Sequence, residues 1–205
     1  MCVVRHTLAD VALTAFQFPQ HNARIVRTDT ISEEYRKLQQ ELHRNPDYGV
    51  ASLAFAPIVA DVMRQTGARS ISDYGAGKKN LLKGLAKAGV SGFEYLPYDP
   101  AFPEYGEPRP ADLVCCIDVL EHIEPELVDN VIDELATITA KWGFFSIHMG
   151  PAGKVLADGR NAHLIQKPSS WWLKRLIEHF EIMHLQTHTM MGRGVWVLVE
   201  PRELD

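Results

Sequence analysis

The sequence contains little cysteine, and the cysteines that it has do not form a disulfide framework. There are 3 cysteines in 205 residues, and Cys115 and Cys116 are adjacent within an apolar run. Neighbouring residues in a strand point to opposite faces, so these two are predicted to be small buried hydrophobic residues. A chain of this length can bury a substantial core in one domain, and it needs neither disulfide bonds nor a structural metal to fold.

Long apolar runs and an excess of positive charge are also missing. No apolar run reaches the length of a transmembrane helix, and Arg5, His6 and Asp10 interrupt the region where a secretory signal would need an apolar core. We therefore expect a cytoplasmic protein. The formal net charge of -5 gives no general attraction to phosphate backbones, which argues against a nucleic-acid partner. One basic cluster is predicted to be a solvated helix face; it consists of Lys78, Lys79, Lys83 and Lys87.

The first quarter of the chain differs in pattern from the rest. Residues 1–48 are predicted to form an N-terminal arm and a helix, a candidate substrate lid, and residues 49–205 the main domain. Thr30 and Glu33 match a capping box that would start this helix, and Asn45-Pro46 would end it. A second helix is expected over 52–65, ending before Gly67.

Strand and helix patterns then alternate along the chain. Strands are predicted at 70–74, 93–98, 112–117, 142–148, 181–187 and 194–200. Helices are predicted at 78–88, 125–140 and 171–180, the last of them capped by Ser169 or Ser170. This alternation indicates an α/β fold in three layers, with a mostly parallel sheet and helices on both faces. The short connection between the last two strands predicts that they are antiparallel.

A glycine-containing bend lies between the first strand and the helix after it. The sequence there is Asp73-Tyr74-Gly75-Ala76-Gly77. Glycine allows a sharp turn and a close approach of the backbone to a ligand, and a helix N-terminus offers unpaired amides and a positive dipole end. The bend therefore predicts a site for a nucleoside-bearing cofactor. A nicotinamide fingerprint would need a third glycine at Asn80, so it fits poorly.

These residues resemble the first motif of class I S-adenosylmethionine-dependent methyltransferases, which have a Rossmann-like fold. The segment 112–123 contains Asp118-Val119-Leu120-Glu121-His122 and is similar to the fourth-strand segment of the branch that includes ubiquinone-biosynthesis O-methyltransferases. The resemblance covers about residues 50–200. It implies S-adenosyl-L-methionine as the cofactor and S-adenosyl-L-homocysteine as its product. The cofactor-binding residues that it implies are Asp73, Tyr74, Gly75, Ala76, Gly77, Asp99, Pro100, Asp118 and Val119.

The resemblance assigns Asp99 to the ribose hydroxyls, because it follows the second strand; alternatively, Asp99-Pro100 only opens a turn. The chain departs from the family at two places. Lys79 stands where many members have a third glycine. The proline-rich link 100–110 is short, where many relatives have a helix, a strand and an acidic residue that contacts the adenine. The adenine contact is therefore not assigned.

Histidines are the best candidates for chemistry. Methyl transfer is an in-line displacement in which the protein aligns the nucleophile and removes its proton, and histidine suits that second task near neutral pH. His122 and His148 follow strands that are expected to end at the ligand-binding edge of the sheet, and His163 lies in the loop 149–167. Alternatively, His122 is structural and is satisfied by Glu121 or backbone. The remaining candidates are interpreted as structural or exposed: His179, His184 and His188.

A set of four residues resembles the metal-binding set of small-RNA 2′-O-methyltransferases: Asp118, Glu121, His122 and His163. Asp118 replaces a glutamate of that set, and metal-free members of the broader family share Asp-x-x-Glu-His, so no metal is expected. Trp171-Trp172 could stack on a base or an aromatic substrate, but tryptophans in the first turn of a packed helix are more often core or lid residues.

The sequence therefore predicts a methyltransferase, a monomer or a homodimer, that acts on oxygen or nitrogen of a small molecule. One alternative is an RNA or DNA methyltransferase in which Arg24, Arg27 and the lysine cluster contact phosphates. The other is a non-catalytic module that binds the cofactor.

Overall fold

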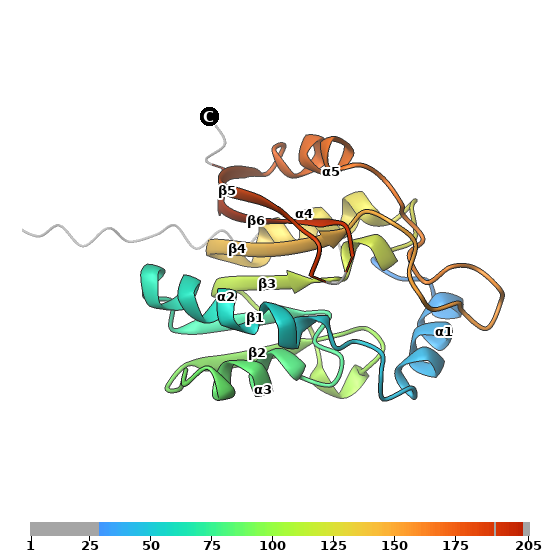
Figure 1. The fold of residues 1–205 in the computed structure, drawn as a ribbon, viewed down its shortest axis with the longest axis horizontal. Helices are drawn as coiled ribbons and strands as arrows, with labels where there is room; N and C mark the ends of the chain where they lie inside the picture. Colours follow the sequence, from blue (N-terminus) through green and yellow to red (C-terminus); the bar gives the residue numbers. More distant parts are fainter. Residues whose placement is uncertain (1–28, 191, 203–205) are drawn as a thin grey trace, which may run out of the picture.

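A six-stranded sheet forms the centre of the computed structural model, which describes residues 29–190 and 192–202 (Figure 1). The strands lie in the order β2-β1-β3-β4-β6-β5. Four of them are parallel, and β6 pairs antiparallel with both β4 and β5. Their bounds are β1 Ser70–Tyr74, β2 Glu94–Tyr98, β3 Ala111–Ile117, β4 Thr139–His148, β5 Phe180–His188 and β6 Gly194–Pro201.

Helices cover both faces of the sheet. On one face, α2 (Ala51–Thr66) and α3 (Asn80–Lys87) pack on apolar side chains of β1, β3 and β4. On the other face, α4 (Val128–Ile138) and α5 (Ser169–Leu176) close a second core. A further helix, α1 (Glu33–His43), lies beyond the ends of the strands, at the right-hand side of Figure 1. The predicted α/β class, the parallel sheet and the antiparallel last pair are thus confirmed.

Cys115 and Cys116 illustrate why the sheet needs two apolar layers. Both are fully buried, and they belong to the cores on opposite faces. The first strand matches its predicted bounds. The helix α2 is capped by Gly67, which has a φ of 69° and whose amide donates a hydrogen bond to the Met63 carbonyl, as in an ordinary glycine cap. None of the helices in 29–190 and 192–202 is long and apolar enough to span a membrane.

The start of the first helix differs from the prediction. Its cap is Ser32, not Thr30: the Ser32 hydroxyl accepts a hydrogen bond from the Tyr35 amide at 3.1 Å. The same hydroxyl and the Ser32 amide donate to the carboxylate of Glu124, at 2.7 and 2.8 Å. A partner distant in sequence therefore selects between two possible caps. Most of the predicted N-terminal arm, with Arg24 and Arg27, lies outside the described residues.

Three other helices have bounds that differ from the prediction. The helix predicted to start at Lys78 begins at Asn80, because Lys79 adopts the left-handed conformation with φ 56°. The helix predicted over 125–140 spans 128–138, because the chain enters β4 at Thr139, which pairs with Ala111.

The third of these helices is α5, and both its cap and its end differ from the prediction. Neither predicted serine caps it, since Ser169 is already helical and Pro168 holds the cap position. The helix ends at Leu176 instead of reaching Phe180, which begins β5.

The link between β2 and β3 is as short as the sequence indicates. Residues 100–110 contain the 3-10 turn η1 (Pro103–Tyr105) and no strand. The segment likened to a fourth strand is therefore β3, the third in chain order, and His148 ends the fourth strand.

Candidate functional site

The glycine bend packs tightly against the turn that follows β3. Gly75 has a φ of 79°, and a Cβ placed on it would overlap the side chain of Val119. The amides of Gly75 and Ala76 both donate to the Tyr98 carbonyl, at 2.8 and 2.9 Å. Glycine is therefore required at Gly75 for both its conformation and the lack of space.

Asp99 secures the second half of the bend. Its carboxylate accepts hydrogen bonds from the amides of Gly77 and Ala101, at 2.9 and 2.8 Å. Burial raises the pKa of Asp99 to about 6, although these two bonds act in the opposite direction. Asp99 is thus more than a turn opener, since it lines a pocket and holds the glycine bend in place.

Asp73 occupies a different place from its neighbours. It is buried beneath the bend, where its carboxylate accepts a hydrogen bond from the Tyr95 hydroxyl, and it does not line the pocket. Burial raises its pKa to about 7. Tyr74 points to the opposite face of the sheet, where its hydroxyl donates to Glu134 at 2.7 Å. Asp73 therefore supports the bend from below.

An open pocket with about 890 Å³ of empty space lies at this edge of the sheet. Eight of the nine residues implied as cofactor-binding line it: Tyr74, Gly75, Ala76, Gly77, Asp99, Pro100, Asp118 and Val119. A second hollow of about 680 Å³ adjoins it and shares Tyr48, Asp118 and His122 with it. His148 and His163 line only the second hollow. The site therefore has two compartments that meet at Asp118 and His122.

The turn after β3 brings two acids together. Asp118 has a φ of 60°, and its amide donates to the carbonyl and the hydroxyl of Ser146, at 3.1 Å each. Glu121 is fully buried, and its carboxyl accepts from the His148 amide at 2.5 Å. Burial, followed by the nearby Asp118 charge, raises the pKa of Glu121 well above its ordinary value. Glu121 therefore connects the turn after β3 to the end of β4 through this hydrogen bond.

The three predicted catalytic histidines converge. The ring of His163 lies 4.6 Å from that of His122 and 4.7 Å from that of His148, measured between centroids. Nδ1 of His122 lies 2.8 Å from the Ala162 carbonyl, and Nδ1 of His163 lies 2.7 Å from the Gly150 carbonyl. A carbonyl can only accept, so both Nδ1 atoms carry the proton, and both Nε2 atoms keep a free lone pair.

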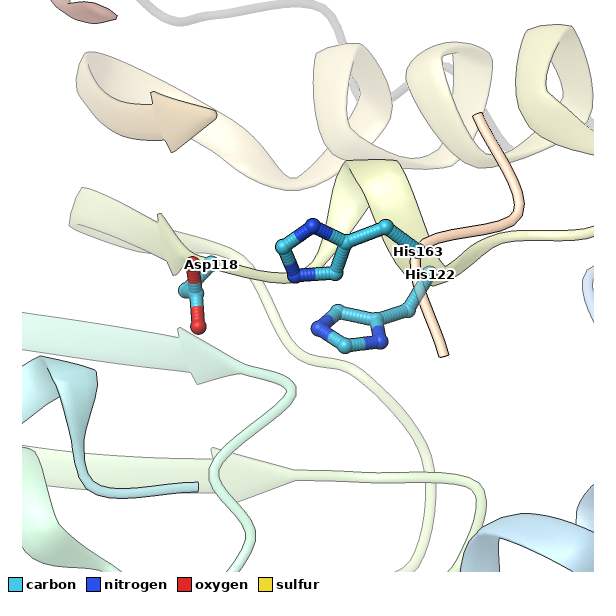
Figure 2. Close-up of side chains that lie close together, drawn as sticks. All are labelled: Asp118, His122 and His163. Atoms are coloured by element: carbon cyan, nitrogen blue, oxygen red, sulfur yellow. The ribbon is translucent and has the colours of Figure 1, made fainter. Parts of the chain in front are cut away.

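Burial keeps these imidazoles neutral. It lowers the pKa of His122 to about 4, against the opposing effect of Asp118, and it also lowers the pKa of His163. One ligand atom each from Asp118, His122 and His163 lie within 4.8 Å of one another, and Figure 2 shows the two rings beside the carboxylate. A carboxylate and two neutral imidazoles, each held through its other nitrogen, make a plausible donor set for a divalent ion.

Three of the four residues of the metal-binding set therefore come together. Glu121 does not join them, because its carboxyl is buried against the His148 amide. His148 differs from the other two histidines as well: its Nδ1 lies 3.0 Å from the amide and 3.1 Å from the carbonyl of Gly150, so these contacts do not fix its tautomer, and it is not part of the cluster.

Several other predicted residues have structural surroundings. Trp172 is fully buried in the core, and the guanidinium of Arg175 lies over the Trp171 ring. His179 lies 3.0 Å from Asp133, and His184 stacks on Trp196. His188 packs against Phe55, and its ring nitrogens are buried without a partner among the described residues.

The lysine cluster is not a single solvated face. Lys78 donates to backbone carbonyls of Asn45 and Tyr48, at 2.5 and 3.1 Å. Lys79 lies over the Tyr105 ring, and Lys83 donates to the Asn80 side chain at 3.1 Å. Lys78 thus connects the glycine bend to the segment after α1, and Lys79 connects it to the link that contains Tyr105.

Sequence reasoning missed the wall that α1 and the segment after it contribute. Gln39 and His43 from α1, and Tyr48 from the segment after it, line the pocket, and His43 lies against the glycine bend. Tyr48 lies between the two compartments, with its hydroxyl 3.4 Å from Nδ1 of His122. No local motif marks these residues, because their role depends on where α1 packs.

Comparison with known proteins finds similarity in structure but not in sequence. No family model matches the chain, and no curated protein matches it. A solved 1,6-didemethyltoxoflavin-N1-methyltransferase from Burkholderia thailandensis, with 1,6-didemethyltoxoflavin and S-adenosylhomocysteine bound, has a TM-score of 0.58 at 14% identity; the match covers 86% of this chain and 92% of that one.

Two further solved structures match a shorter share of their own length. The mitomycin 7-O-methyltransferase MmcR has a TM-score of 0.56 at 15% identity, over 81% of this chain and 58% of that one. TnmH has a TM-score of 0.54 at 15% identity, over 80% of this chain and 61% of that one. At these identities the likeness establishes the fold: the chain has the Rossmann-like architecture of class I methyltransferases.

Proposed function

We propose that this protein is an S-adenosylmethionine-dependent methyltransferase that acts on oxygen or nitrogen of a small-molecule acceptor. The observation that carries the proposal is the pocket between the glycine bend and Asp99, at the edge of the sheet where open α/β folds bind ligands. The fold shared with solved methyltransferases supports it, since one of them holds S-adenosylhomocysteine and another is named as an O-methyltransferase.

The two compartments then have separate tasks. The glycine bend and Pro100 would hold the nucleoside, and Asp99 would accept hydrogen bonds from the ribose hydroxyls. When bound, the cofactor supplies an electrophilic methyl group on a sulfonium. The hollow lined by His148 and His163 would receive the acceptor, and Asp118 and His122, at the junction, would orient its nucleophile. Asp73 would act indirectly, by supporting the bend.

Calorimetric titration with S-adenosylhomocysteine tests this proposal. The wild-type chain should bind it, and Asp99→Asn should weaken binding about 10- to 100-fold, because a hydrogen bond to a charged group contributes roughly 1.5–3 kcal/mol. Glu104→Gln is the matched control, since Glu104 is an exposed acid in the same link and does not line the pocket. Equal affinity of the Asp99→Asn and wild-type proteins would refute the ribose assignment. If a cofactor labelled in its methyl group transfers no label to any component of a cell extract, the result would favour a non-catalytic binding module.

A second candidate is metal-assisted transfer to a hydroxyl group, which includes a nucleic-acid 2′-hydroxyl. The observation that favours it is the cluster of Asp118, His122 and His163, in which both Nε2 lone pairs are free. A pKa of about 4 makes His122 a weak base near neutral pH, whereas a metal ligand has to be neutral. These residues would hold a divalent ion such as Mn²⁺ or Mg²⁺, which would polarise the hydroxyl.

Titration with Mn²⁺ distinguishes the two candidates. If the cluster is a metal site, the wild type should bind one ion, and His163→Ala should weaken binding more than tenfold, in line with the effect of disturbing even outer metal partners. His179→Ala is the control, because His179 pairs with Asp133 away from the cluster. If His163→Ala and wild type respond alike, metal assistance is excluded and the metal-independent reaction stands. An oligonucleotide that binds with a steep salt dependence would support a nucleic-acid acceptor.

A further inference from the structure

The segment between α1 and α2 crosses the glycine bend. We call residues 43–50 the strap. His43, Tyr48 and Gly49 line the cofactor pocket from this segment. Cε1 of His43 lies only 3.1 Å from the position that a Cβ on Gly77 would take. The imidazole therefore covers backbone that the proposed function gives to the cofactor.

Two side chains tie the strap to the start of α3. The Lys78 ammonium donates to the carbonyls of Asn45 and Tyr48, at 2.5 and 3.1 Å, and the Asn80 amide donates to the Gly49 carbonyl at 2.9 Å. Neither Lys78 nor Asn80 lines the pocket. Both therefore hold the strap without touching the pocket themselves.

The contact of His43 with the bend involves no hydrogen bond. Its Nδ1 is buried without a partner among the described residues, and its ring contacts are edge-on, to Tyr48 and Phe102. Burial, followed by the nearby Lys78 charge, lowers the pKa of His43 to about 4, so the ring is neutral. A buried nitrogen without a partner is unfavourable, and moving the ring away from the bend would relieve it.

The rest of α1 is held more firmly. Near its start, Ser32 makes two hydrogen bonds to Glu124, and the Tyr35 hydroxyl donates to the His122 carbonyl at 2.6 Å. At the other end of the strap, Gly49 has a φ of 72°, a conformation that favours glycine. Movement of the strap is therefore bounded by α1 and Gly49, and within it the Tyr48 hydroxyl makes a further hydrogen bond, to the Gln39 side chain at 3.1 Å.

We propose that the strap is a gate over the cofactor pocket, and that Lys78 and Asn80 are positioning residues that hold it closed. This inference rests on the proposed function, because the gated ligand is its cofactor. The hydrogen bonds of Lys78 and Asn80 to the strap, which we call the latch, have to break before His43 can leave the Gly77 backbone that it covers. Loosening the latch raises the open fraction of the protein, which speeds both entry and exit of the ligand.

Surface plasmon resonance of the immobilised full chain, with S-adenosylhomocysteine in the flow, measures both rates. Lys78→Met and Asn80→Ala should each raise the association and the dissociation rate about 5- to 10-fold, as expected for the loss of hydrogen bonds of ordinary strength. The affinity should change less than about threefold, because a gate affects both rates. Lys87→Met is the matched control, an exposed lysine at the far end of α3, and it should leave both rates unchanged.

Hydrogen exchange provides a second measurement. In the unliganded protein, amides of residues 44–49 should exchange faster in Lys78→Met than in wild type, while amides of β3 remain unchanged. A faster dissociation without a faster association, or unchanged rates, would overturn the gate and leave a static wall. If the wild type binds no S-adenosylhomocysteine at all, the proposed function fails and the gate fails with it, which is distinguishable from a wild type that binds and variants that do not differ.

Discussion

The two walls of the site, one at the glycine bend and one at the histidines, differ in how their polar groups are partnered. At the bend, the amides of Gly75 and Ala76 donate to Tyr98, and the Gly77 amide donates to Asp99. At the other wall, Nε2 of His122 and of His163 make no hydrogen bond within the described residues. The polar groups of the first wall are already paired with one another, so this wall offers a ligand mainly its shape. The second wall keeps nitrogen lone pairs that a ligand or an ion can bind.

The difference indicates that the two walls have different tasks, recognition at the glycine bend and chemistry at the histidines. A wall whose amides and carboxylates already bond one another changes little when a ligand enters, so it suits recognition. A wall with free imidazole lone pairs beside a carboxylate suits chemistry, because those atoms can still bind a proton or a metal. Three substitutions test how rigid each wall is.

Gly75→Ala should have the largest effect. The left-handed conformation costs an alanine about 1–2 kcal/mol, and the overlap with Val119 adds an overpacking penalty of about 1–3 kcal/mol. We expect the free energy of unfolding in urea to fall by roughly 2–5 kcal/mol in total. Gly89→Ala is the control, since Gly89 has a φ of 77° with nothing near its Cβ position. Equal losses for both variants would show that the glycine wall is not tightly packed.

Asp73→Asn should remove a dependence of stability on pH. The folded pKa of Asp73 is raised to about 7 from 3.8, so the ionised form destabilises the fold, and wild-type stability should fall as the pH rises between these values. At about 1.4 kcal/mol per pKa unit, a rise from 3.8 to about 7 corresponds to a loss of at most about 4 kcal/mol. Urea unfolding at pH 4 and pH 8 measures it, and the asparagine variant should show a smaller fall.

Asp112→Asn is the contrasting control for that experiment. Its hydrogen bond with Lys141 lowers the pKa of Asp112, so this carboxylate contributes stability that is present above its ordinary pKa and is lost as the pH falls. If Asp73→Asn keeps the full wild-type slope between pH 4 and pH 8, the carboxyl beneath the glycine wall is already solvated.

Tyr35→Phe should have the smallest effect, on the histidine wall. Its hydroxyl donates to the His122 carbonyl at 2.6 Å and accepts from the Gln39 amide at 2.6 Å. Loss of these bonds should lower the free energy of unfolding by about 1–2 kcal/mol. Gln40→Ala on the same helix is the control, because Gln40 makes a longer bond, of 3.3 Å, to Ala101 at the other wall. A larger loss for Gln40→Ala would mean that α1 is anchored mainly to the glycine side.

The fold could be predicted well because its signals are local. The strands β3 and β6 are short apolar runs, and Gly67 ends a helix by its own conformation. Boundaries failed where a distant segment decided them. Thr30 and Ser32 both suit a helix cap, and the carboxylate of Glu124 selects Ser32. Likewise, Thr139 joins β4 because Ala111 lies opposite it in the sheet.

The candidate site divides in the same way. The sequence by itself determined the layered α/β order and the glycine bend, because backbone conformation and strand length are set by neighbouring residues. Only the tertiary structure decided that Asp118, His122 and His163 meet, and that Asp73 lies beneath the pocket. The packing of α1 across the strand ends decided that His43 and Tyr48 line the pocket. These contacts join segments far apart in the chain, and no local pattern encodes which side chains will face one another there.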